Sequence, residues 1–235
     1  MRIAFNQPAF IPWGGFFARL ACSDRMVLLD ETVLARGFSY VNRNRLKGPA
    51  GEIRVTIPLK KKGRGAQKIK ELEIHKKEAW TRDFLLTLRY FYGKSLYFET
   101  VYETIRAVVE LQDNGFLRLS RGLIQSLQSG LGIDHEVILQ SNLAVTGKGT
   151  PLLVSLAKKA GADEAVLPYF SGKAVDAEFF KKERIRVWFL RYDPPQYPQF
   201  WGGFLKNLSA LDLLFCCGPE GRQVVQKGTF LHEYR

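Results

Sequence analysis

The first thirty residues, MRIAFNQPAFIPWGGFFARLACSDRMVLLD (1–30), decide the fold of this chain. Residues 2–6 are typical of a short strand, which ends at Gln7-Pro8 because proline lacks an N–H donor and restricts the residue before it. A loop with two prolines and paired glycines then leads into a short amphipathic helix, and the apolar run 26–30 is typical of a buried strand. Strand, loop, helix and strand in this order predict a βαβ unit and a parallel sheet.

The same alternation returns in the second half of the chain. Strand-like runs at 136–140, 164–168 and 185–192 are joined by a helix pattern with Thr150 as its expected cap, and a last helix pattern covers about 208–217. We therefore predict an α/β fold with a predominantly parallel, Rossmann-like sheet.

Between these halves the pattern changes. Residues 53–57 alternate like a half-buried strand, and 60–70 form a basic loop that we expect to be exposed and mobile, with 70–74 as a returning strand. Apolar residues at helical spacing over about 76–131 predict three amphipathic helices. No linker is evident, so we expect one domain over residues 1–235 with a helical subregion at about 76–131.

Composition excludes several classes of protein. The 235 residues are 46% hydrophobic and 25% charged, which argues against a disordered or fibrous chain. No run approaches eighteen apolar residues, so we expect no transmembrane segment, and the N-terminus lacks a secretory apolar stretch. Three cysteines form no disulfide framework and no Cys/His group has zinc spacing. We expect a cytoplasmic protein without a metal site, and the sequence assigns no cofactor.

The positive charge is concentrated in one segment. Residues 43–70 carry a net charge of +9 out of the +12 of the whole chain. Such a field attracts phosphates, nucleic acid or anionic lipid heads. No helix-turn-helix, zinc-finger or RNP-type pattern is present, so a nucleic-acid or anionic-membrane binding module is kept as an alternative to a small-molecule site.

Candidate binding residues follow the ends of the first two predicted strands. Gln7 and Trp13 lie in the loop after the first strand, where α/β folds bind ligands, and they offer an amide and a stacking face. Asp30 closes the second strand at the same edge and is the candidate catalytic base; a cap or turn role is the alternative.

Other candidates lie in polar turns. Asn42-Arg43-Asn44 places two amides beside a guanidinium that suits phosphate or carboxylate, although a hydrogen-bonded turn explains the same residues. TGKGT (146–150) fails the P-loop signature, but Lys148 before a helix can hold one anion. Ser171 and Gln199 complete the candidate set.

Four blocks in this order resemble the WbqC-like protein family. They are QPAFIPWGGFFARLACSDRMVLLD, NRNRL followed by RVTIPL, GADEAVLPYFSGK, and YPQF, GGF and NLSALDLLFCCG, and together they span about residues 3–219. Asn6 stands where many relatives have His or Met.

The resemblance implies a bacterial enzyme of cell-surface polysaccharide (O-antigen) biosynthesis. Its implied reaction is transfer of an amino acid or another acyl group to an amino sugar or nucleotide sugar, and a phosphorylated or carboxylated small molecule is the expected partner. A nucleotidyl- or adenylyl-transferase-like enzyme is the second alternative, although the chain lacks an H-x-G-H element. We expect the candidate residues to converge on one concave site.

Overall fold

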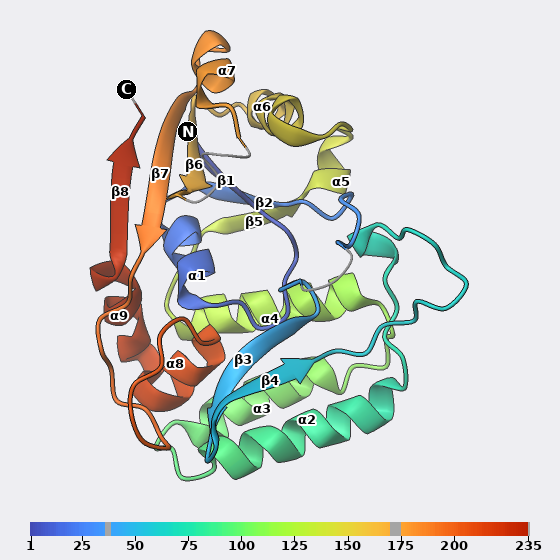
Figure 1. Ribbon diagram of the computed structural model, residues 1–235, viewed down its shortest axis with the longest axis vertical. Coiled ribbons are helices and arrows are strands. Elements are labelled where there is room, and N and C mark those ends of the chain that lie inside the picture. Colours follow the sequence, from blue (N-terminus) through green and yellow to red (C-terminus); the bar gives the residue numbers. More distant parts are fainter. Residues whose placement is uncertain (36–38, 170–174, 235) are drawn as a thin grey trace.

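The computed structural model describes residues 1–35, 39–169 and 175–234. At the centre of this part of the chain lies a six-stranded sheet in the order β5-β2-β1-β6-β7-β8 (Figure 1). Its strands are β1 (Arg2–Asn6), β2 (Arg25–Leu28), β5 (Glu136–Leu139), β6 (Glu164–Pro168), β7 (Arg186–Tyr192) and β8 (Thr229–Glu233). All pairs are parallel except β7 with β8. The predicted α/β fold with a predominantly parallel sheet is confirmed.

The strand order creates a switch point between β1 and β6. The chain builds outward from β1 through β2 to β5, and then crosses back to place β6 on the other side of β1. Counted along the chain, the order is 3-2-1-4-5-6, the arrangement in which α/β sheets bind ligands at the carboxyl ends of the strands beside the switch. Here these ends are Asn6 and Pro168.

The two faces of the sheet bury separate apolar clusters. Successive strand residues point to opposite faces, so Ile3 and Phe5 join one cluster and Ala4 joins the other. Helices α6 (Gly149–Lys159) and α7 (Ala177–Lys182) cover the first face, and α1 (Gly14–Ala21) covers the second (Figure 1). Burial on both sides explains why these strands are continuous apolar runs.

The chain between β2 and β5 forms a hairpin and a helical layer below the sheet (Figure 1). The hairpin pairs β3 (Arg43–Gly48) with β4 (Gly51–Thr56). The helices are α2 (Lys77–Tyr92), α3 (Phe98–Val109) and α4 (Phe116–Gly130), as the periodicity of 76–131 predicts.

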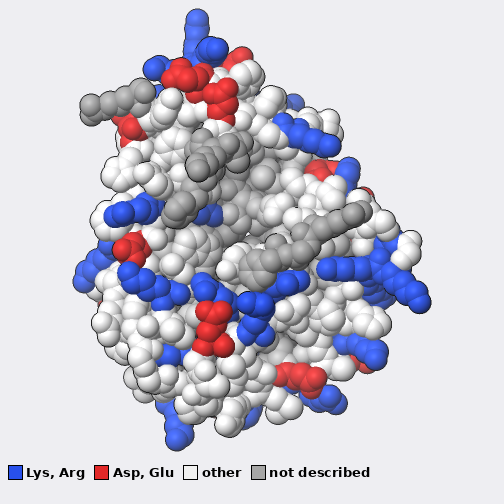
Figure 2. All heavy atoms as spheres, viewed as in Figure 1, with Lys and Arg blue, Asp and Glu red and all other residues white. Residues whose placement is uncertain are grey.

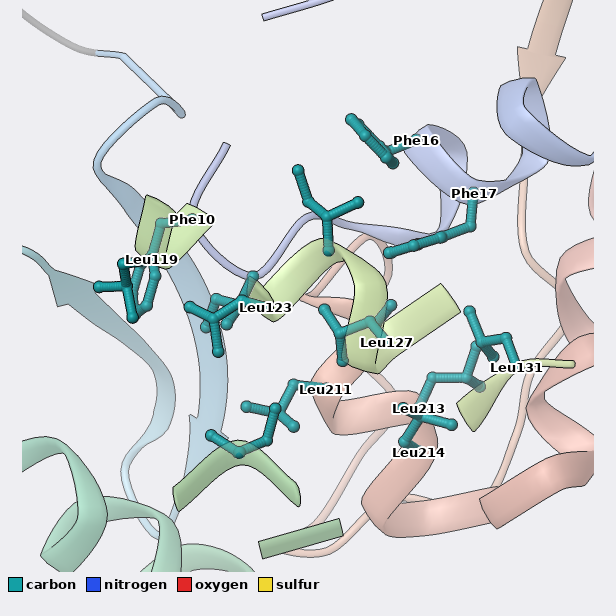
Figure 3. Packing of buried hydrophobic residues seen from close by; sticks show 14 of the residues in the cluster. Phe10, Phe16, Phe17, Leu119, Leu123, Leu127, Leu131, Leu211, Leu213 and Leu214 are labelled. Carbon is teal, nitrogen blue, oxygen red and sulfur yellow. The ribbon is translucent and has the colours of Figure 1, made fainter. Parts of the chain in front are cut away.

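Helix α4 joins this layer to the rest of the protein. Its Leu119, Leu123 and Leu127 are buried between aromatic side chains of the β1–α1 segment and leucines of α8 (Ala210–Cys217), as Figure 3 shows. Burying each leucine is worth about 1.5–3 kcal/mol. One apolar cluster therefore spans the sheet, the helical layer and α8.

The basic segment 60–70 is anchored more firmly than its composition predicts. Residues 61–66 are exposed, but Ile69 in the 3-10 turn η1 (Ile69–Glu71) is fully buried. Two carboxylates bind four of its cations: the nearby Glu73 pairs with Lys60 and Arg64, and Glu31, which is distant in sequence, pairs with Lys68 and Lys70. In place of the expected return strand at 70–74, the structure has two isolated bridges, Ile74 with Leu59 and Glu73 with Gly115.

Several short elements escape the sequence patterns. They are α5 (Gln140–Leu143), η3 (Gly218–Glu220), α9 (Gly221–Lys227), α7 and the edge strand β8. The helix after TGKGT begins at Gly149, and Thr150 accepts a hydrogen bond from the Asp176 N–H instead of capping it. Among the described residues, no helix has the length and apolar character needed to cross a membrane.

Candidate functional site

A pocket of about 650 Å³ opens at the carboxyl end of β1, beside the switch point. Three parts of the chain that are distant in sequence form its wall: the loop after β1, the approach to β3, and the segment before α8. The described residues that line it are Asn6, Gln7, Pro8, Ala9, Pro12, Trp13, Phe16, Ala35, Ser39, Tyr40, Val41, Asn44, Arg45 and Asn207. Its size is that of a typical small-molecule site.

The loop after β1 is held in a strained path. Ile11 has a φ of 37°, a left-handed conformation that is rare for a β-branched residue, and its side chain is fully buried. Its carbonyl accepts hydrogen bonds from Asn44 Nδ2 at 2.8 Å and from Ser209 Oγ at 2.6 Å. Strain of about 1–3 kcal/mol persists only where the surrounding structure imposes it, and it clusters at ligand sites.

Asn44 shapes the pocket from β3. Its amide donates to the carbonyls of Phe10 and Ile11, and its Oδ1 accepts from the Arg45 N–H at 2.9 Å. Asn42 is also buried, and it donates to the Ile57 carbonyl at 2.8 Å. Asn42 and Asn44 therefore hold neighbouring loops together. Arg43, which lies between them, is the first residue of β3.

Gln7 follows the carboxyl end of β1, beside the switch point. Its Nε2 donates to Thr32 Oγ1 at 2.9 Å, which links the ends of β1 and β2. Its side chain is only half-buried, so the amide oxygen remains available to a ligand in the pocket.

Trp13 forms an aromatic wall with Tyr192. The two rings meet edge to face at 5.4 Å. A Cβ on Gly15 would lie 2.5 Å from the Trp13 indole, and one on Gly14 would lie 2.3 Å from the Tyr192 hydroxyl. The paired glycines are thus needed to let both rings cover the start of α1. Burial raises the pKa of Tyr192, so its hydroxyl stays protonated.

Arg45 and Asn207 close the opposite wall. Arg45 donates to Glu52 at 2.9 Å and to the Asn207 carbonyl at 2.8 Å. Asn207 has a φ of 60°, and its buried Oδ1 has no partner among the described residues. Sequence reasoning missed both residues, although NRNRL already contained Arg45.

Basic side chains gather around this pocket. Figure 2 shows Lys and Arg in a band between the parallel sheet and the β3–β4 hairpin. Across the hairpin, Arg45 pairs in register with Arg54, and Arg43 lies two residues away. Glu52 offsets part of this charge. The field at the pocket mouth is therefore positive, and it favours an anionic ligand.

Arg19 of α1 was also missed. Its buried side chain does not line the pocket itself, but it donates through Nη2 to Oδ1 of Asn6, which does. Burial lowers the pKa of the Arg19 guanidinium to about 10. The signal was a charged residue three positions after Phe16, on the face that the apolar pattern assigns to the core.

Asp30 lies outside the lining of the pocket. Its carboxylate is fully buried, accepts from the Ser141 N–H at 3.0 Å and the Ser141 hydroxyl at 2.7 Å, and so caps α5. The pocket lining therefore includes Gln7, Trp13 and Asn44 but not Asp30, whose carboxylate contacts Ser141.

Gln199 belongs to a different, buried network. Its Oε1 accepts from Lys47 Nζ at 3.2 Å, and its Nε2 donates to Asp212 Oδ2 at 3.1 Å. Asp212 also accepts from the hydroxyls of Tyr92 at 2.7 Å and Tyr197 at 2.8 Å. Ser209 caps α8 through the Leu211 N–H, whereas the Asp212 carboxylate points into the core.

Among the described candidates, Asn42, Arg43 and Lys148 do not line the pocket either. Lys148 is exposed just before α6, and Ser171 lies outside the described residues. Within the described part of the chain, no group of three or more His, Cys, Asp or Glu side chains is placed to hold a metal ion.

The amino-acid sequence of this chain is similar to those of known proteins. The WbqC-like protein family matches residues 7–224, which include the loop after β1, β3 and Asn207. The chain is also 31% identical over 221 residues to the uncharacterized protein Rv1507c of Mycobacterium tuberculosis. That match covers 93% of this chain and 95% of its relative.

Proposed function

The chain belongs to the WbqC-like protein family, and from this premise we propose that it is a transferase of cell-surface polysaccharide biosynthesis. Its substrate is an amino sugar or nucleotide sugar, which receives an amino acid or another acyl group. The pocket at the end of β1 is the proposed substrate site.

One observation carries this proposal: the pocket opens at the switch point of a 3-2-1-4-5-6 sheet. Folds of this order bind phosphorylated cofactors and substrates at this place because strand ends and loops converge there. The combination of an aromatic wall, half-buried amides and a positive rim suits a flat or sugar ring that carries negative charge.

The proposed roles follow the contacts of each side chain. Trp13 stacks on the ring of the ligand, and Gln7 binds a hydroxyl or amide through its free oxygen. Arg43 and Arg45 attract a phosphate or carboxylate at the rim. Asn42 and Asn44 act as positioning residues, since their amides already hold the loops that shape the wall.

The chemical step needs a group that takes up the proton of the attacking amine. The described lining contains no carboxylate, histidine or cysteine. Asp30 remains the proposed base, and each of its carboxylate oxygens keeps a lone pair beyond the one that Ser141 occupies. An acyl donor that is already activated needs little more than alignment with a neutral amine.

A thermal-shift panel tests the proposal. Nucleotides, nucleotide sugars, amino sugars and amino acids are compared on the wild type, on Gln7→Ala, and on Gln226→Ala as a control with an exposed glutamine on α9. We expect a saturable shift with a nucleotide sugar or amino sugar that Gln7→Ala weakens and Gln226→Ala preserves. Stabilisation by nucleoside triphosphates alone would favour the nucleotidyl-transferase alternative.

The nucleic-acid alternative is tested separately, by the salt dependence of DNA and RNA binding. A phosphate-backbone binder loses affinity steeply with salt because it releases counterions. Four cations of segment 60–70 are paired with Glu31 and Glu73, which reduces the charge available for such binding. Tight, salt-sensitive binding of DNA or RNA without a small-molecule shift would overturn the proposed function.

A further inference from the structure

Arg19 is a buried cation without an anionic partner. It is 5% exposed, and its guanidinium makes a single hydrogen bond, to the neutral amide of Asn6. Its Nε is buried without a partner among the described residues. Of the five N–H donors of this arginine, one is therefore used within the described part of the chain.

The other deeply buried cation of the protein shows the contrast. Lys47 is 1% exposed, and its ammonium donates to Gln199 Oε1 and to the carbonyls of Gly202 and Gly203. Buried charges normally acquire such partners because desolvation is costly. Arg19 departs from this rule within the same molecule.

The position of Arg19 explains what it lacks. Helix side chains lean toward the helix N-terminus, so this long side chain reaches from the last turn of α1 back to the end of β1. Its two neighbours, Asn6 through the hydrogen bond and Phe16 one turn before, both line the pocket. Its Nη1 has no partner among the described residues and, unlike Nε, is not sealed from solvent.

We propose that Arg19 and Asn6 form the oxyanion subsite of this pocket, where the guanidinium binds a phosphate or carboxylate group of the substrate. This inference rests on the proposed function and adds the anionic group that the pocket recognises beside Asn6. A guanidinium matches both groups through paired N–H donors. Asn6 orients the guanidinium and is a positioning residue.

The direct test is anion binding at constant ionic strength. Inorganic pyrophosphate and acetate are titrated by calorimetry into wild type, Arg19→Gln, Arg19→Lys, and the control Arg82→Gln, whose arginine is exposed on α2. We expect saturable binding of at least one anion, weakened tenfold or more in Arg19→Gln, partly kept in Arg19→Lys and unchanged in Arg82→Gln. The anion that binds distinguishes a phosphate from a carboxylate subsite.

A second readout needs no variant. In the wild-type protein, the NMR signal of the Arg19 Nε–H should shift with the same dissociation constant that calorimetry gives. An unshifted signal, or an Arg19→Gln variant that binds pyrophosphate and acetate within twofold of wild type, would overturn the subsite.

Sugar ligands separate this inference from the proposed function. If a nucleotide sugar binds wild type and Arg19→Gln equally, the subsite is refuted and the proposed function stands. If anions bind through Arg19 but no sugar ligand binds, the subsite stands and the proposed function is refuted.

Discussion

Replacing Asp212 by alanine should destabilise the protein severely, although this residue lies outside the pocket. The Asp212 carboxylate is fully buried and is the common acceptor for Tyr92, Tyr197 and Gln199. Through these donors it joins α8 to α2 and to the segment before Phe204. Asp212→Ala removes the acceptor of these three donors. The hydroxyls of Tyr92 and Tyr197 are buried, whereas the half-buried Gln199 keeps its hydrogen bond to the Leu205 carbonyl.

The magnitude follows from those three donors. A buried polar group left unpaired costs about 1–3 kcal/mol. Part of that cost is offset, because removing the carboxylate also removes the charge that was buried. We expect a net loss of about 3–5 kcal/mol, as is usual when one member of a buried polar network is deleted. This is a large share of a typical stability of about 5–15 kcal/mol.

Urea unfolding measures the loss. With a slope near 3 kcal/mol per molar, the midpoint should fall by about 1–1.7 M at unchanged slope. Asp193→Ala is the control, because Asp193 forms an exposed ion pair with Lys206 that is worth at most about 1 kcal/mol. A loss below about 1 kcal/mol in Asp212→Ala would refute the role assigned to this network.

The same carboxylate gives a pH signature. Burial raises the pKa of Asp212 above its unfolded value near 3.9. Between these two pKa values the folded state binds the extra proton, so this group makes stability fall as pH rises through that range. The fall should be absent in Asp212→Asn. An identical pH profile in wild type and variant would contradict the assignment.

Gly14→Ala should lower the free energy of unfolding by about 1–3 kcal/mol, because the new Cβ would lie 2.3 Å from the Tyr192 hydroxyl. Gly203→Ala is the control, because a Cβ at that position meets open space. Equal melting temperatures of the two variants would refute the close approach. Asp30→Ala should lower the free energy of unfolding by about 1–2 kcal/mol, because it removes the acceptor for Ser141 at the start of α5. Asp30→Asn should stay folded. Full transferase activity in this folded variant would exclude Asp30 as the catalytic base. Hydrogen bonds from Arg64 and then Lys60 lower the pKa of Glu73 to about 2, so its stabilising effect is complete above its unfolded value near 4.3 and disappears as pH falls toward 2. In the wild type, the protection of residues 61–66 from hydrogen exchange should fall over this pH range. This fall should be absent in Glu73→Gln, and an unchanged profile would argue against the ion pairs.

Most of the fold could be predicted from local patterns. The strand and helix signals of residues 1–30 set the βαβ start, and the four-residue spacing over 76–131 gave the helical layer. Strand β8 escaped because an edge strand with one exposed face lacks a continuous apolar run. Segment 60–70 was judged by its own composition, whereas its ends are held by Glu31 and Glu73 from elsewhere in the chain.

The candidate site was predicted only in part, because a pocket depends on tertiary contacts. Gln7 and Trp13 were found from their position after the first strand, which topology alone fixes. Asp30 and Gln199 have the right chemistry and lie near strand ends or turns, but their partners Ser141 and Asp212 direct them into the core. No spacing rule reveals such partners in advance.

The central claim is that the pocket at the end of β1 binds the substrate. A crystal structure of the complex with the sugar ligand that gives the largest thermal shift tests it most directly. We predict ligand density between Trp13 and Asn207, with an anionic group against Asn6 and Arg19. Density instead in the hollow between α4 and β5, which His135 lines, with none at the end of β1, would contradict the account.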